Sequence, residues 1–308
     1  MNQVFRWVGY SKQAFHQKMD RQLKDQEQQL LLLPLIRQLR REHPGVAARE
    51  LYLMLKPESM GRDKFESFCF DHGLKLEKPK AYKRTTDSRG VIRFPNLTAA
   101  VEFTGVNQAW SSDITYYQIE EDVYYITFIM DLHSRRIVGH HVSRRLVTEQ
   151  TTIPALEMAL KQRKPPEGLI FHSDGGGQYY SKEFLKLTRS AKIKNSMCDI
   201  VYENAHAERI NRTIKEQYLK GYDPKCYGDL VKMTDRAVHN YNFKRPHKSL
   251  KKMPPVVFEK NMPAGGSSSA IDNFCNFTTT IEQNQKNYPL PKSTKTKSTG
   301  VKKTVNVF

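Results

Sequence analysis

Residues 109–131 read AWSSDITYYQIEEDVYYITFIMD, and this stretch decides the fold. Ala109–Gln118 and Val123–Asp131 are rich in aromatic and β-branched residues, and the acidic segment Ile119–Asp122 separates them. Runs of this composition on either side of a short polar segment predict two adjacent antiparallel strands. The first strand carries Asp113, so this stretch places a carboxylate in the sheet.

Strands and helices alternate on the carboxyl side of this pair. The pattern predicts strands at 136–142, 169–172 and 193–197, and helices at 148–163 and 181–191. Three antiparallel strands followed by alternating helices and strands predict a mixed sheet with helices on both faces. The fold class is therefore α/β. The order is compatible with a ribonuclease H-like core over residues 106–260, in which the first and fourth strands are neighbours.

Three acidic residues lie in segments that read as parts of one site. Asp113 lies in Trp110-Ser-Ser-Asp-Ile-Thr115, Asp174 in His172-Ser-Asp-Gly-Gly-Gly-Gln-Tyr179, and Glu208 in Glu203-Asn-Ala-His-Ala-Glu208. Three converging carboxylates can hold two magnesium ions, which activate an attacking oxygen on phosphorus and stabilise the leaving oxygen. We therefore expect Asp113, Asp174 and Glu208 to be catalytic residues and ligands of two Mg²⁺ ions, with Mn²⁺ as a substitute.

Glu208 lies on a helix predicted over about 204–218. Ala207, Ile210 and Ile214 form its apolar stripe, and Glu208, Asn211, Arg212 and Lys215 recur on the other face. Arg212 and Lys215 are expected to hold phosphates beside the carboxylate. The alternative is a solvated face with an ordinary Glu–Arg pair four residues apart.

The charge of the chain indicates the partner class. Fifty Lys and Arg against 32 Asp and Glu give a formal charge of +18, which favours nucleic acid over a merely basic soluble protein. The four cysteines lack paired spacing, so we expect reduced thiols, with Cys69 packed in a helix. No apolar run is long enough to span a bilayer and no signal core is seen, so the expected location is cytoplasmic, at the nucleoid.

The first 79 residues are predicted to be helical. Helices are expected at 34–42, 46–55 and 62–72, with Gly73 capping the last. This helix-turn-helix-like arrangement would bring Arg62 and Lys64 to DNA, and a helical spacer is the alternative. Residues 80–105 read as a basic linker whose Lys83 and Arg84 lie along phosphates, and residues 261–308 as a disordered basic tail.

The motifs together resemble one family. They are Trp110-x-x-Asp-Ile-Thr115, Asp131-x-x-Ser-Arg-x-Ile-Val-Gly139, His172-Ser-Asp-x-Gly-x-Gln-Tyr179, Asn204-Ala-x-x-Glu208 with Lys215, and Tyr241-Asn-x-x-Arg-Pro-His-x-Ser-Leu250. The chain resembles, from about residue 4 to 258, the transposases of the insertion-sequence three family, which share a catalytic core with retroviral integrases. The resemblance implies that Asp113, Asp174 and Glu208 form the metal-binding DDE triad and that Lys215 matches a basic residue seven positions after the glutamate.

The resemblance also implies partners and a reaction. Such a protein cuts the ends of a mobile element and joins the 3′ hydroxyl to another phosphodiester, acting as a homo-oligomer on DNA. It is the product of a second reading frame and works with an upstream product. Three features depart from the family pattern: Asp174-Gly-Gly-Gly177 where Asp-Gln-Gly is common, Glu203-Asn-Ala205 where Asp-Asn-Ala is common, and a shortened loop between Met197 and Glu203.

Several roles stay open at this point. His172 either orients a carboxylate or is a hydrogen-bonded structural histidine, and Gln178 is expected beside the acids or at DNA. Arg245, in the motif that begins at Tyr241, either packs the end of the core or contacts DNA. A decayed DNA-binding regulator and a nuclease of the same fold remain the alternative functions.

Overall fold

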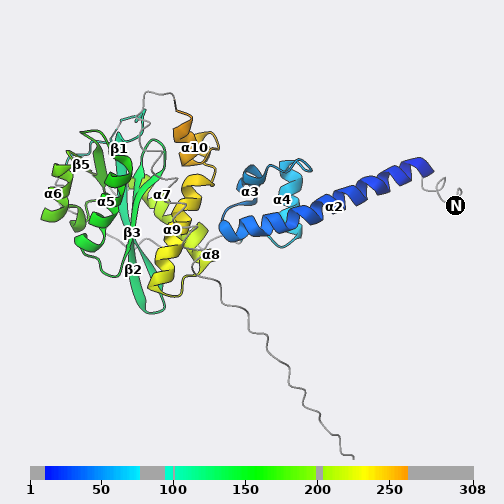
Figure 1. Ribbon diagram of the computed structural model, residues 1–308, viewed down its shortest axis with the longest axis horizontal. Coiled ribbons are helices and arrows are strands. Elements are labelled where there is room, and N and C mark those ends of the chain that lie inside the picture. Colours follow the sequence, from blue (N-terminus) through cyan, green and yellow to red (C-terminus); the bar gives the residue numbers. More distant parts are fainter. Residues whose placement is uncertain (1–10, 77–93, 100, 199–203, 263–308) are drawn as a thin grey trace, which may run out of the picture. The chain divides into compact units, whose positions relative to one another are not determined.

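The computed structural model describes residues 11–76, 94–99, 101–198 and 204–262. Lys83 and Arg84 of the expected linker, and the expected tail beyond residue 262, lie outside these described residues. The described chain consists of an N-terminal helical unit, made of the helices α2 to α4, and a sheet flanked by helices (Figure 1).

Within the described residues, five strands form one mixed sheet in the order β3-β2-β1-β4-β5. β1 (Ala109–Ile119), β2 (Asp122–Asp131) and β3 (Ile137–Ser143) are antiparallel, whereas β4 (Ile170–Ser173) and β5 (Lys194–Met197) run parallel to β1. The predicted strands are confirmed to within a residue or two. The first and fourth strands are neighbours, and the fold is the ribonuclease H-like mixed sheet.

Helices cover both faces of the sheet (Figure 1). On one face α5 (Thr152–Arg163) and α6 (Lys182–Ser190) pack on alternate strand residues such as Trp110, Ile129 and Val138. On the other face α7 (Ala205–Ile214) and α9 (Tyr227–Phe243) pack on the intervening residues Ile126, Phe128 and Met130. Because side chains alternate across a strand, both faces are apolar and both must be covered.

The helical unit differs from the prediction at its start. The prediction of a helix beginning at Pro34 is wrong: α2 runs from Lys12 to Glu42 and passes through Pro34. Ser11 caps it by accepting a hydrogen bond from the Ala14 N–H at 3.1 Å. Residues 12–33 contain no glycine and many strong helix formers, so one backbone hydrogen bond lost at proline does not end the helix. Although α2 has 31 residues, no helix among the described residues is apolar over a bilayer-spanning length.

The rest of the helical unit follows the prediction. α3 (Ala48–Leu55) and α4 (Arg62–Asp71) are joined by a short turn, and Cys69 is fully buried among apolar side chains. Gly73 has a φ of +71° and donates to the Phe70 carbonyl, while Leu74 donates to the Cys69 carbonyl. This is the left-handed helix end that the sequence predicts.

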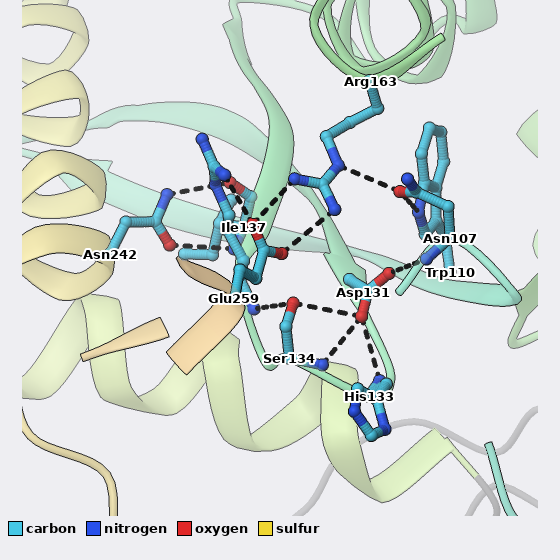
Figure 2. A network of polar contacts seen from close by, with 10 residues as sticks. Asn107, Trp110, Asp131, His133, Ser134, Ile137, Arg163, Asn242 and Glu259 are labelled. Carbon is cyan, nitrogen blue, oxygen red and sulfur yellow. Dashed lines mark hydrogen bonds and ion pairs between the residues drawn. The ribbon is translucent and has the colours of Figure 1, made fainter. Parts of the chain in front are cut away.

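A buried ionic cluster fastens α10 (Pro255–Lys260), the last helix among the described residues, to the sheet (Figure 2). The Glu259 carboxylate accepts hydrogen bonds from Arg136 at 2.6 Å and from Arg163 at 2.8 and 3.0 Å. The three side chains are only 4–7% exposed. Burial raises the pKa of Glu259, but the two guanidinium groups outweigh burial and hold it below its usual range. Arg163 also donates to Asn107, whose backbone N–H donates to Asp131.

We expect Glu259→Gln to lower the free energy of unfolding by about 3 kcal/mol, because it leaves two buried guanidinium groups without a counter-charge. Urea denaturation measures the change. Glu167→Gln is the matched control, since the Glu167–Lys192 pair is exposed (73% and 63%) and should change stability by less than about 1 kcal/mol. Equal effects of the two substitutions would contradict a structural role for the cluster.

His43 introduces a dependence of stability on pH. The ring is fully buried, lies edge-on to Tyr218 and has its Nδ1 3.1 Å from the Tyr218 hydroxyl. Burial, with the nearby positive charge of Lys244, lowers the pKa of His43 from 6.5 to about 4. Between these two pKa values His43 binds a proton in the unfolded chain but stays neutral in the folded protein, so the free energy of unfolding decreases as the pH falls.

Acidification from pH 7 to 4 should therefore cost up to about 3 kcal/mol of folding free energy through His43. His247, whose pKa burial also lowers, acts in the same direction, so the informative quantity is the difference between the wild type and His43→Gln. Urea denaturation across this pH range should show a shallower pH dependence for the variant. An unchanged slope would show that His43 does not titrate in this way.

Candidate active site

The pairing of β1 with β4 brings two of the three acidic residues together. Ser111 lies opposite His172 in parallel register. Asp113 follows Ser111 by two residues and Asp174 follows His172 by two, so the two carboxylates leave neighbouring strands at the same level. The expected neighbourhood of Asp113 and Asp174 is confirmed.

The negative charges of Asp174 and Glu208 both act on the Asp113 carboxyl group. Burial and the negative charge of Asp174 raise the pKa of Asp113 to about 7, and Glu208 adds a weaker repulsion. Burial also raises the pKa of Asp174. Hydrogen bonds to Asp113 from the Ile114 N–H at 2.8 Å and from Asn211 at 2.8 Å act in the opposite direction. The arrangement concentrates unneutralised negative charge at one place, which is what a cation site requires.

Helix α7 is held against β1 by a row of polar contacts, here called the β1–α7 row. Ser111 donates to Asn204 at 2.6 Å, Asn211 donates to Asp113 at 2.8 Å, and the Lys215 ammonium lies 3.2 Å from the Thr115 hydroxyl. The three strand residues alternate along β1 and so share one face of the sheet. Glu208 lies between Asn204 and Asn211 on α7, and the row therefore holds its helix beside Asp113.

Asn211 and Asn204 were missed as site residues by sequence reasoning. The sequence places Asn211 on the same helix face as Glu208 without giving it a role, whereas in the structure it is only 7% exposed and its amide donates to a carboxylate oxygen of Asp113. Its Oδ1 is buried without a hydrogen-bond partner among the described residues. Polar residues at alternate positions of a buried strand, such as Ser111, Asp113 and Thr115, are the signal that could have indicated polar partners on the covering helix.

The loop after β4 shapes the surroundings of Asp174. Gly175 has a φ of +82°, and a Cβ there would lie 2.4 Å from the Met197 methyl. The Gly176 N–H donates to the Asp174 carboxylate at 3.1 Å. The Nδ1 of His172 lies within hydrogen-bond distance of the Ser196 and Thr98 hydroxyls, at 3.0 and 3.2 Å, which supports its structural role. Gln178, in the 3₁₀ turn Gly177–Tyr179, is half-buried.

The basic residues expected at DNA fall into different settings. Lys215 is half-buried over the Tyr116 ring at 4.6 Å, and Arg212 is exposed at the end of α7. Arg62 pairs with Asp63 and Glu66 on its own helix, and Lys64 is exposed there. The Arg245 side chain is only 12% exposed and contacts Gln217 and Glu50, which favours the packing alternative over DNA contact.

The acidic residues fit a divalent cation by donor chemistry. Carboxylate oxygens are the ligands that Mg²⁺ and Mn²⁺ prefer, and the mutual repulsion that raises the pKa of Asp113 is relieved by a bound cation. Among the described residues, no three His, Cys, Asp or Glu side chains are gathered closely enough to form a complete metal cage. The three acids thus share a charge environment rather than a finished coordination shell.

Comparisons with known proteins find sequence similarity to integrase cores and to insertion-element proteins. Two family models described as "Integrase core domain" match residues 104–201 and 191–255. The chain is 28% identical over 258 residues to the insertion element IS600 uncharacterized 31 kDa protein of Shigella sonnei. This alignment covers 82% of this chain and 94% of that protein. It is 36% identical over 120 residues to the transposase InsF of insertion sequence IS3A from Escherichia coli, covering 38% of this chain and 41% of InsF.

Solved structures show a limited likeness in fold. The integrase catalytic core domain of HTLV-2, solved with magnesium, matches 51% of this chain and 99% of its own length with 21% identity and a TM-score of 0.44. The simian T-cell lymphotropic virus intasome bound to PP2A regulatory subunit B56 gamma matches 71% of this chain with 19% identity and a TM-score of 0.47. These similarities are too low to transfer a role to any residue.

Replacing Asn211 by Leu should weaken divalent-cation binding by roughly 10- to 100-fold, because a residue that orients a ligand contributes to affinity on that scale. Isothermal titration with Mn²⁺ measures the affinity directly. Asn195→Leu removes an amide that bonds Thr188 instead, at 3.0 Å, and should leave the affinity unchanged. Unaltered Mn²⁺ affinity in Asn211→Leu would show that the Asp113 carboxylate needs no such support.

Proposed function

We propose that this chain, which belongs to the insertion-sequence three (IS3) family of transposases and carries an integrase core, cuts and joins DNA. Asp113, Asp174 and Glu208 are the proposed catalytic residues. One observation carries the assignment of residues: burial and the charges of Asp174 and Glu208 together raise the pKa of Asp113 to about 7. The charges of Asp174, at the end of β4, and of Glu208, on α7, thus both act on Asp113 of β1.

The three carboxylates would hold one or two Mg²⁺ ions. Bound there, Mg²⁺ supplies Lewis-acid activation of the attacking oxygen and stabilises the leaving oxygen. Asn211 fixes the orientation of Asp113, and Asn204 fixes the start of the helix that carries Glu208. The protein's own contribution is therefore to hold Asp113 and the helix of Glu208 in place before DNA arrives, which lowers the cost of assembling the site.

Lys215 is proposed to hold a phosphate of the DNA beside the acids. Its ammonium group lies against Thr115, two residues beyond Asp113 on the same face of β1. Arg212 is exposed one turn earlier on the same helix. Two cations next to a carboxylate cluster suit a polyanion whose scissile phosphate is held at the acids and whose neighbouring phosphates lie on the basic groups.

The reaction proceeds in two chemically similar steps. Water attacks a phosphodiester at the end of the element and releases a 3′ hydroxyl, and this hydroxyl then attacks a second phosphodiester. The bond to the leaving oxygen breaks as the new P–O bond forms, so no covalent protein intermediate is required. We further propose a homo-oligomer on DNA, cooperation with an upstream-frame product, DNA contacts by Arg62 and Lys64 and by Lys83 and Arg84 outside the described residues, and a cytoplasmic, nucleoid-associated location.

The proposal is tested with labelled DNA from the two flanks of the gene, incubated with the purified protein and Mg²⁺ or Mn²⁺. We expect 3′-end cutting and joining, and a decrease of more than about 1000-fold in Asp174→Asn and in Glu208→Gln, since metal-held charge stabilisation contributes several kcal/mol to the barrier. Asp235→Asn is the control, because Asp235 is an exposed acid that pairs with His140 outside the site.

The other outcomes identify the rival functions. Cutting without joining would indicate a nuclease of the same fold. DNA binding without cutting, in the presence of the upstream product as well, would indicate a regulator with inactive acids. Full activity in Glu208→Gln would remove Glu208 from the site.

A further inference from the structure

The helix that carries Glu208 loses its regular geometry directly after α7. Lys215–Leu219 form a π-helical turn, in which the Lys220 N–H donates to the Lys215 carbonyl, before α8 (Lys220–Tyr222) resumes the α-helix. A π-helical turn carries one extra residue, is rare, and occurs frequently at functional sites. Tertiary contacts hold this turn on both of its sides.

One side of this turn is held by the active-site strand. Lys215, its first residue, contacts Thr115 at 3.2 Å and the Tyr116 ring at 4.6 Å. At its other end the Tyr117 hydroxyl donates to the Leu219 carbonyl at 3.4 Å. The π-helical turn is therefore the place where Lys215 is set relative to β1 and Asp113.

The other side is held by His43-Pro-Gly45, here called the docking turn, which joins α2 to α3. The Gly45 N–H donates to the Gln217 carbonyl at 2.8 Å. A Cβ on Gly45 would lie 2.5 Å from the Gln217 Cα and 2.9 Å from the Glu216 carbonyl oxygen. Across the same contact, a Cβ on Gly221 would lie 2.3 Å from Pro44. The two backbones approach so closely that only glycine fits at these positions.

Side chains complete the contact. His43 is buried with its Nδ1 3.1 Å from the Tyr218 hydroxyl. Arg245 donates to the Gln217 side chain at 3.1 Å and to Glu50 of α3 at 3.3 Å, and so joins the π-helical turn to the helical unit. Asn240 donates to the Glu42 carbonyl at 2.9 Å. The motif from Tyr241 to His247, whose role the sequence left open, thus lies next to this contact.

The docking turn is itself held in shape from within the helical unit. The Arg40 guanidinium donates to the carbonyls of Val46, of Pro44 at 3.2 Å and of Leu74 at 3.3 Å. Two carbonyls from the connection between α2 and α3 and one from the segment after α4 share one cation, so the docking turn is a preformed surface rather than a loose loop.

We propose that the docking turn positions Lys215 for the reaction by holding Lys215–Leu219 in the π-helical form. The inference rests on the proposed function of Lys215. A helix that relaxes to the α-helical repeat rotates one flank against the other by about 100° for each residue removed from a turn. Asn204 and Asn211 fix α7 on β1, so the rotation has one of two results. Either Lys215 loses its contact with Thr115, or Tyr218 and Leu219 leave their buried positions. The position of the helical unit is thereby linked to the position of the Lys215 ammonium group beside the three acidic residues.

The experiment compares Gly45→Ala with Gly61→Ala in the full chain. Gly61 has nothing within 4 Å of an added Cβ, so this variant should match the wild type in every measurement. We expect Gly45→Ala to cut at least about tenfold more slowly at saturating DNA, with an unchanged Kd for DNA, because small misplacements of a positioning group act on rate. Amide hydrogen exchange in residues 215–222 should become faster.

A double-substitution test separates positioning from general damage. In a Lys215→Ala background, adding Gly45→Ala should slow cutting by less than about twofold further, because the effect passes through Lys215. Multiplicative losses would overturn the proposal, as would unchanged exchange and cutting in Gly45→Ala. Hydrogen exchange needs no activity, so its result stands even if the chain neither cuts nor joins DNA.

A second pair of variants covers the case in which Gly45→Ala does not fold. Gly221→Ala disturbs the same contact from the core side, and Gly228→Ala is its control, since the nearest atom to an added Cβ there is the Cys226 sulfur at 3.9 Å. Slower cutting and faster exchange in Gly221→Ala alone would support the proposal. Equal behaviour of Gly221→Ala and Gly228→Ala would overturn it.

Discussion

The β1–α7 row is the constraint on which the site depends. Strand side chains repeat every two residues and helix side chains every 3.6, so Ser111, Asp113 and Thr115 can meet Asn204, Asn211 and Lys215 in one register only. Buried polar groups must be paired, and Ile210 and Ile214 must stay in the core. Sliding the helix by one residue would break both conditions. Glu208 reaches the vicinity of Asp113 because its helix has no other stable position.

The protein uses buried carboxylates in two opposite ways. At Glu259, two guanidinium groups neutralise one carboxylate, the pKa falls, and the cluster ties α10 to the sheet. At Asp113, burial and the charges of Asp174 and Glu208 are not neutralised, and the pKa rises to about 7. The first arrangement lowers the energy of the folded chain. The second leaves the repulsion uncompensated, and a cation placed there would relieve it.

The helical unit is part of the mechanism through backbone contact rather than through charge. Gly45 of the docking turn packs directly on the backbone of Glu216 and Gln217 in the π-helical turn, and Gly221 of α8 packs on the Pro44 ring. Such close backbone packing transmits displacement with little loss, because a packed interior has low compressibility. His43-Pro-Gly45 and Arg245-Pro-His247, about two hundred residues apart in the sequence, thus lie in one interface, where Arg245 contacts Gln217 and Glu50.

The sequence by itself determined the order of strands and helices, the apolar stripe of α7 and the capping by Gly73, because each follows from local periodicity or turn chemistry. The neighbourhood of Asp113 and Asp174 followed from the ribonuclease H-like order of strands with which this pattern is compatible. Sequence reasoning failed at Pro34, where strong helix formers on both sides outweighed one lost hydrogen bond. Only the tertiary structure decided the partners of Asn211, Arg245 and Gly45 and the π-helical turn. Asn211 meets Asp113 across 98 positions of sequence, and no local pattern encodes which distant carboxylate or carbonyl a buried donor will find, since packing alone sets that distance.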